Sequence, residues 1–74
     1  MKTLADLNIG ETAVIKSIEA TGELKKRLLS FGARKGTQVH VNMLGVKKST
    51  ISVCIGKTCI AIRLEEARTI SIED

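Results

Sequence analysis

Two alternating segments separated by a two-residue connection constrain the fold of this chain more than any other feature. Residues 50–55 and 58–64 each alternate apolar and polar side chains, and Gly56 and Lys57 lie between them. A glycine at the first position of such a connection is typical of a type II′ β-hairpin, whose loop length fixes the pairing. The predicted register is Ile55 with Thr58, Cys54 with Cys59, Val53 with Ile60, Ser52 with Ala61 and Ile51 with Ile62. The apolar partners then share one face, as expected for strands with one buried side.

Residues 21–36 predict one short helix followed by a tight turn. Thr21 is the predicted N-cap, because its hydroxyl can accept a hydrogen bond from a free amide of the first turn. Apolar side chains recur at positions i, i+4 and i+7 on one face of this helix: Leu24, Leu28 and Phe31. Gly32 follows the last of them, where helices commonly end at positive φ, and Gly36 supplies a second permissive point.

Other segments complete the predicted architecture. Thr3 and Asp6 have the spacing of a single capped helical turn. Three further strands are predicted at residues 12–18, 37–43 and 68–72, with a loop at 44–49 and a polar turn at 65–67. Five short strands with one helix after the first most simply close into a small, partly open barrel, with the helix over one end. The alternative is an open antiparallel sheet with the helix on one face.

Length and composition limit what this barrel can do. A chain of 74 residues is expected to form one domain, and it contains no Pro, Trp or Tyr and one Phe. Its core must be built from Ile, Val, Leu and Ala, which leaves few large side chains to line a roomy active site. No secretory leader and no apolar run of about 20 residues is present, so we expect a soluble cytoplasmic protein.

The two cysteines and the histidine form the sharpest candidate for a chemical site. The hairpin register places Cys54 opposite Cys59, and pairing Val41 with Val53 would bring His40 opposite Cys54. Such a row could bind zinc or another divalent metal once the thiols lose their protons. Free cysteines, however, often fill small apolar spaces, and a cross-strand disulfide is disfavoured in a reducing cytosol. The sequence therefore predicts reduced, unliganded thiols and no cofactor, with these three residues as metal candidates.

Basic side chains are the other candidate for a functional surface. A nucleic-acid patch could be formed by Lys25, Lys26, Arg27, Arg34, Lys35, Lys47, Lys48 and Lys57. Stacking of bases on aromatic side chains usually supports such binding, and the single aromatic, Phe31, is predicted to lie inside. We therefore expect no nucleic-acid partner and predict a protein-docking rim instead: Lys25, Arg27, Arg34 and Lys35. No combination of a nucleophile with a base is identifiable, so no catalytic residue is predicted.

The sequence resembles the FeoA family from end to end. The resemblance is carried by the order and spacing of Leu4, Leu7, Gly10, Arg27, Leu28, Gly32, Gly36, Ile60, Ala61, Ile62, Arg63, Glu66, Ala67, Ile70 and Ile72. It implies one FeoA-like domain over residues 1–74, folded as a mainly β, five-stranded SH3-like barrel with one short helix between strands 1 and 2.

The same resemblance implies a function without enzymatic activity. Members of this family are cytoplasmic accessory or regulatory proteins of bacterial ferrous iron uptake. The implied partner is FeoB, a membrane iron transporter with its own GTP-binding domain, so contact with the membrane would come only through this partner. Two alternatives stay open, namely a small basic nucleic-acid-binding barrel and an iron- or zinc-sensing domain. A homodimer formed through exposed strand edges also stays open.

Overall fold

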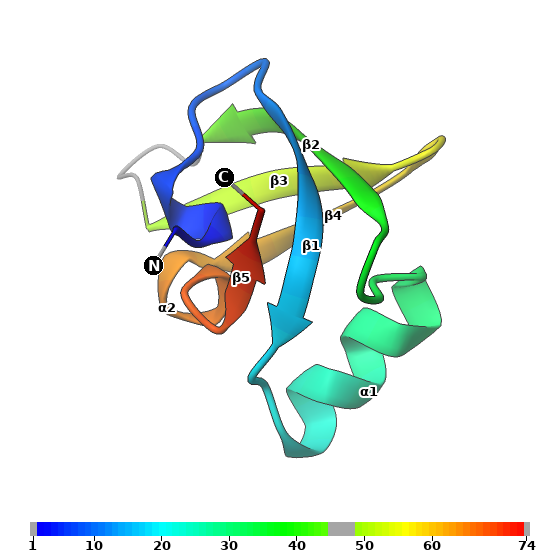
Figure 1. Cartoon of the computed structure of the whole chain (residues 1–74). Coiled ribbons are helices and arrows are strands. Elements are labelled where there is room, and N and C mark those ends of the chain that lie inside the picture. The colour runs from blue at the N-terminus through cyan, green and yellow to red at the C-terminus, as the bar shows by residue number, and fades with distance from the viewer. Residues whose placement is uncertain (1, 45–48, 74) are drawn as a thin grey trace.

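The computed structural model describes residues 2–44 and 49–73 (Figure 1). Its elements follow the chain in the order η1, a 3₁₀ turn (Leu4–Asp6), β1 (Thr12–Ile18), α1 (Gly22–Phe31), β2 (Gln38–Leu44), β3 (Thr50–Ile55), β4 (Thr58–Arg63), α2 (Leu64–Ala67) and β5 (Ile70–Ile72). The described ranges thus contain five strands with the longer helix between the first two, which confirms the predicted mainly β fold.

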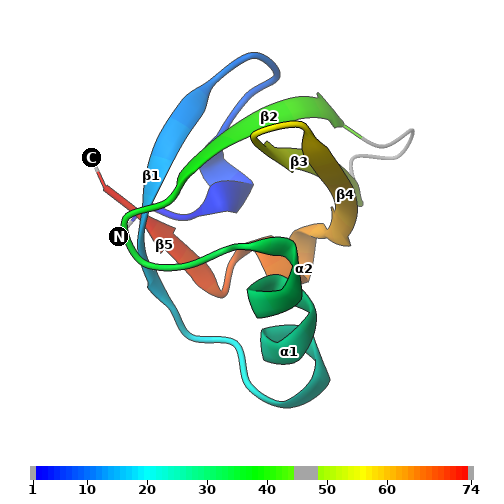
Figure 2. The ribbon, with the colours of Figure 1, turned by 90° about the vertical axis from the view of Figure 1, so that its right-hand side faces the viewer.

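The strands of the described residues form one antiparallel sheet in the order β4-β3-β2-β1-β5. In Figure 2 they surround a common interior, and α2 occupies the interval between the two edge strands, β4 and β5. The N-terminal segment covers the outer edge of β5, because the Ile72 amide donates to the Lys2 carbonyl at 3.0 Å and Thr3 pairs with Ser71. The fold is therefore the predicted partly open barrel, and β4 presents its main uncovered edge.

The hairpin of β3 and β4 has the predicted register throughout. Its pairs include Ile55 with Thr58, Cys54 with Cys59 and, at the far end, Ile51 with Ile62. Gly56 adopts a φ of 61°, which a side chain with a Cβ rarely takes. The two-residue turn and the alternating pattern therefore specify the same register.

One apolar cluster fills the barrel. Its members are buried and come from every element, with the largest fully buried side chains being Leu4, Ile15, Leu28, Ile51, Ile62, Ile70, Val39, Val41 and Val53. Val39 and Val41 alternate with the exposed Gln38, His40 and Asn42 along β2, as the pattern predicted. The inner face of β2 is therefore apolar and buried, and its outer face is polar and exposed to solvent.

The helix α1 is fixed to the core by one face. Leu28 is 1% exposed, while Leu24 and Phe31 are partly buried against the core cluster. Gly32 ends the helix in the left-handed region at a φ of 100°, as predicted. Thr21 occupies the N-cap position with extended backbone, but its side chain makes no capping hydrogen bond, so this part of the prediction is wrong.

The segment after β4 differs from the sequence prediction. A polar turn is predicted at 65–67, whereas the structure has the helical turn α2. Arg63 precedes α2, and its amide donates to the Glu66 carboxylate at 2.8 Å. Ala67, the last residue of α2, is fully buried. The amide of Thr69 then bonds to the Glu66 carbonyl at 3.1 Å. These bonds keep the chain helical through this segment, so β5 begins only at Ile70.

The remaining boundaries are close to those predicted. The turn η1 is present, with the Thr3 amide donating to the Asp6 carboxylate at 2.8 Å. The strand β2 begins and ends one residue later than predicted. The predicted loop at 44–49 falls mainly on residues 45–48, which lie outside the described residues, as do Lys47 and Lys48 of the basic set.

Candidate functional site

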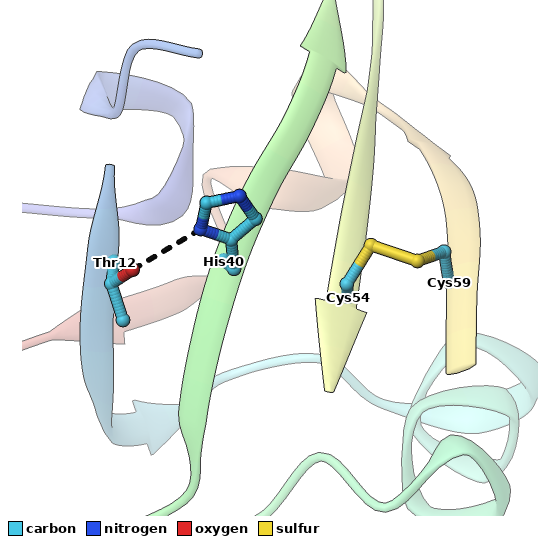
Figure 3. The surroundings of a disulfide bond; sticks show 4 residues. All are labelled: Thr12, His40, Cys54 and Cys59. Carbon is cyan, nitrogen blue, oxygen red and sulfur yellow. Dashed lines mark hydrogen bonds between the residues drawn. A yellow bond between two sulfur atoms is a disulfide. The ribbon is translucent and has the colours of Figure 1, made fainter. Parts of the chain in front are cut away.

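A row of four side chains crosses the outer face of the sheet from β1 to β4 (Figure 3). Thr12 pairs with His40, His40 with Cys54, and Cys54 with Cys59. The structure confirms the neighbouring positions predicted for His40, Cys54 and Cys59. Thr12 was missed, because α1 separates β1 from β2 and no short turn fixes the register of these two strands.

The two cysteines are joined by a disulfide, so the prediction of reduced, free thiols is wrong. Their Cα atoms lie 4.0 Å apart. Opposed residues in antiparallel strands approach most closely at non-hydrogen-bonded positions, and the two-residue turn puts Cys54 and Cys59 at such a position. The prediction rested on the redox state of a cytosol, whereas the local geometry favours the bond.

Exposure and hydrogen bonding differ along the row. Cys54 is 9% exposed, whereas Cys59 and His40 lie in the open. The Nδ1 atom of His40 lies 3.1 Å from the Oγ1 atom of Thr12. Within the described ranges, no group of three or more His, Cys, Asp or Glu side chains is placed to hold a metal ion. Sulfur atoms joined to each other are not thiolates, so the row cannot ligate a metal through them in this form.

A groove of about 410 Å³ lies between α1 and β4. The side chains that line it from α1 are Glu23, Lys26, Arg27, Ser30 and Phe31, and those from β4 are Thr58 and Ile60. Phe31 and Ile60 are half-buried and form its apolar wall. The groove exists because β4 is an edge strand, so α1 packs beside it without a further strand between them.

Two ion pairs lie at the rim of this α1–β4 groove. Lys26 pairs with Glu23 at 3.9 Å, and both side chains are more than three-quarters exposed, so the pair contributes little to stability. Arg27 pairs with Glu66 of α2 at 3.8 Å, and the side chain of Glu66 is only 21% exposed. This second contact links α1 to α2 across the open side of the barrel.

The predicted docking residues lie around the same helix. Lys25, Arg27, Arg34 and Lys35 are all exposed, and of these four Arg27 lines the groove. The helical pattern predicted that Phe31 lies inside the barrel, but its side chain also forms part of the groove wall. Helical periodicity identifies the buried side of a helix, but not the neighbouring strand that leaves part of that side open.

A second hollow, of about 490 Å³, lies where β3 begins and α2 starts. Its charged side chains, Arg63 and Glu65, form an exposed ion pair of 3.8 Å. The other lining residues are Ser49, Thr50 and Leu64. It contains no aromatic side chain, and it therefore offers less apolar surface for recognition than the α1–β4 groove.

Comparison with known proteins places the chain in a family. The model of the FeoA domain matches residues 2–74. The chain belongs to the FeoA family. FeoA proteins are accessory proteins of ferrous iron transport with an SH3-like fold. Fe(2+) transport protein A of Campylobacter jejuni is 39% identical over 70 residues, which cover 95% of each chain. The Helicobacter pylori protein of the same name is 41% identical over 51 residues, covering 69% of this chain and 67% of its own.

Solved structures of FeoA proteins share the fold. The crystal structure of Stenotrophomonas maltophilia FeoA complexed with zinc, described as an SH3 domain protein, matches with a TM-score of 0.86 and 28% identity, covering 99% of this chain and 91% of that one. Iron(II) transport protein A of Clostridium thermocellum matches with a TM-score of 0.86 and 31% identity, covering 96% of this chain and 44% of that one. No helix in residues 2–44 or 49–73 has the length and hydropathy needed to cross a membrane.

Proposed function

We propose that this protein is a cytoplasmic, non-enzymatic accessory protein of bacterial ferrous iron uptake that binds the transporter FeoB. Membership of the FeoA family supports the link to ferrous iron transport. The observation that carries the binding role is the α1–β4 groove, an exposed recess with an apolar wall and a charged rim on which Lys26 and Arg27 outnumber Glu23. We place the docking surface there.

The chemistry of the groove suits a protein segment. Burying the exposed parts of Phe31 and Ile60 would contribute about 25 cal/mol for each Å² of apolar area removed from water. Lys26 and Arg27 stand beside that wall, while Lys25 extends the positive charge along α1. The matching surface on the transporter should therefore combine an apolar side chain with acidic neighbours, because complementary charges accelerate association and fix orientation.

The single aromatic residue argues against the nucleic-acid alternative. Phe31 is half-buried between α1 and β4, so it presents no open ring on which a base could stack. The basic side chains then serve a protein partner better than a nucleic acid. Binding of a nucleic acid would also fall steeply with added salt, which distinguishes it from a largely apolar contact.

Charge reversal at the groove tests this proposal. Full-length FeoB in nanodiscs is titrated with the wild-type protein and with Lys26→Glu, and binding is followed by biolayer interferometry. Lys26→Glu should weaken binding about tenfold, mainly through slower association, because it reverses a rim charge. The matched control is Lys16→Glu, which makes the same change on the exposed side of β1.

Two results would contradict the proposal. Absence of any binding to full-length FeoB or its cytoplasmic domain would remove the FeoB partnership. Equal weakening by Lys16→Glu and Lys26→Glu would show that net charge, and not the α1–β4 groove, governs the contact. Whether the protein forms a homodimer, which the sequence leaves open, can be checked on the same samples, because light scattering gives the mass of the free protein.

A further inference from the structure

We propose that Cys54, Cys59 and His40 form a redox-controlled site for a soft divalent cation. The disulfide closes the site, and a thiol reductant opens it by converting the bond into two thiols. The proposed docking function gives no role to this row. The proposal rests on the arrangement of these side chains and not on FeoB binding.

The two sulfur atoms stay neighbours whether or not they are bonded. The turn and the pairs on either side, Ile55 with Thr58 and Val53 with Ile60, set the register of the hairpin. Val53 is buried in the core, so this pairing does not depend on the disulfide. Reduction should therefore leave two thiols on the same face of adjacent strands, with their Cα atoms close to the present 4.0 Å.

The disulfide is open to reduction from one side. Cys59 is exposed, whereas Cys54 is 9% exposed, so an incoming thiolate reaches the sulfur of Cys59 first. Its attack breaks the bond between the two cysteines, forms a mixed disulfide with Cys59 and releases Cys54 as a thiolate. A second thiol of the reductant then attacks the mixed disulfide and frees Cys59. The reductant, a cellular dithiol, leaves as its own disulfide, and its two protons end on the cysteines.

His40 supplies a third ligand beside the thiols. It lies directly opposite Cys54, and such cross-strand pairs have Cβ atoms about 4.5–5.5 Å apart. Its Nδ1 atom faces Thr12 Oγ1 at 3.1 Å, and Figure 3 shows the other ring nitrogen on the side of the ring away from Thr12. When Nδ1 donates to Thr12, the lone pair is on Nε2. A histidine that ligates a metal typically donates its other N–H in this way.

The donor set selects the class of cation. Two thiolates and one imidazole suit zinc and other soft-preferring divalent ions, with water completing a tetrahedron. Each thiol gives up its proton when the metal binds. A purely structural disulfide is the competing explanation, but a bond that closes a loop of six residues restricts the unfolded chain less than one that closes a longer loop. That explanation also gives no role to the histidine and threonine of the same row.

Zinc titration of the whole chain in two redox states tests the proposal. The oxidised protein and the protein pre-reduced with a phosphine are titrated with zinc chloride by calorimetry. Reduced protein should bind one zinc ion per chain, and oxidised protein should bind none. Cobalt(II) serves as a second probe, because bands from thiolate-to-cobalt charge transfer report directly on sulfur ligation.

Variants separate the ligands from their surroundings. Cys54→Ser with Cys59→Ser should bind no zinc with or without reductant, and circular dichroism checks that the fold is retained. Thr12→Val should weaken zinc binding about tenfold through loss of its hydrogen bond, and His40→Ala should weaken it further. The matched control is Gln38→Ala, an exposed residue on the same face of β2, which should leave binding unchanged.

Three outcomes would overturn the proposal. Equal zinc binding by oxidised and reduced protein would exclude redox control. Retention of binding by the double serine variant would exclude the thiols as ligands. Absence of binding to the reduced protein, or absence of cobalt–thiolate bands, would show that the row is not a metal site.

Discussion

Replacing Leu28 with alanine tests whether α1 is held to the barrel by its buried face. Leu28 is 1% exposed and belongs to the core cluster, so the change removes three carbon atoms from a fully packed position. At about 0.8 kcal/mol for each buried methylene, the lost transfer free energy is about 2 kcal/mol. The cavity left behind adds to this, and the total for such changes is about 2–5 kcal/mol.

This loss is large for so small a protein. A chain of 74 residues is expected to have a free energy of unfolding of about 4–11 kcal/mol. We therefore expect Leu28→Ala to lower the free energy of unfolding by about 3 kcal/mol. With a urea dependence of about 1 kcal/mol per molar, the midpoint should fall by about 3 M. The protein contains no Trp or Tyr, so unfolding is followed by far-ultraviolet circular dichroism.

The adjacent residue provides the control. Leu29→Ala makes the same chemical change one position along α1, where the side chain is 42% exposed. It should change the free energy of unfolding by no more than about 0.5 kcal/mol. Equal losses in the two variants, or a loss below about 1 kcal/mol for Leu28→Ala, would refute the assigned orientation of the helix, because core truncations cost more than this.

Three further changes can be measured by the same urea titration. Gly32→Ala should lower the free energy of unfolding by about 1–2 kcal/mol, because residue 32 has a φ of 100°. Gly32→Asn should lower it less, since Asn tolerates this conformation. Equal losses in the two variants would show that the backbone conformation is not the cause. Glu66→Ala should lower the free energy of unfolding by about 1 kcal/mol, because it removes the carboxylate that accepts the Arg63 amide at the start of α2. The matched control is Glu65→Ala at the exposed neighbouring position, which should change the free energy of unfolding little. A larger loss for Glu65→Ala than for Glu66→Ala would exclude the capping role of Glu66. Reduction of the disulfide should lower the free energy of unfolding of the wild type by about 2 kcal/mol and leave that of the double variant Cys54→Ser with Cys59→Ser unchanged. If the reductant also destabilised the double variant, the loss could not be assigned to the disulfide.

Features set by neighbouring residues were predictable from the sequence. The register of β3 and β4 follows from a two-residue turn, because such a turn leaves one way to pair strands that bury one face. The end of α1 follows from Gly32, whose backbone conformation few other residues adopt. In both cases the information lies within a few positions of the chain.

Features set by distant contacts were not predictable. The contact of Arg27 with Glu66 requires α1 and α2 to meet, and no local pattern reports that meeting. The pairing of Thr12 with His40 depends on how β1 and β2 align across an intervening helix. The disulfide was predicted to be disfavoured because of the cellular environment, although the predicted register already placed the two cysteines together.

The strand β4 joins the two proposed surfaces, and its geometry keeps them separable. Successive side chains on a strand point to opposite faces, so Thr58 and Ile60 line the α1–β4 groove while Cys59 lies on the outer face. A change at the rim, such as Lys26→Glu, alters charge on one face and leaves the thiol pair intact. A change at Cys59 alters the other face and leaves the register, because the buried Val53 on the inner face and the turn still hold it. The docking role and the metal role can therefore fail independently, and each assay reports on one of them.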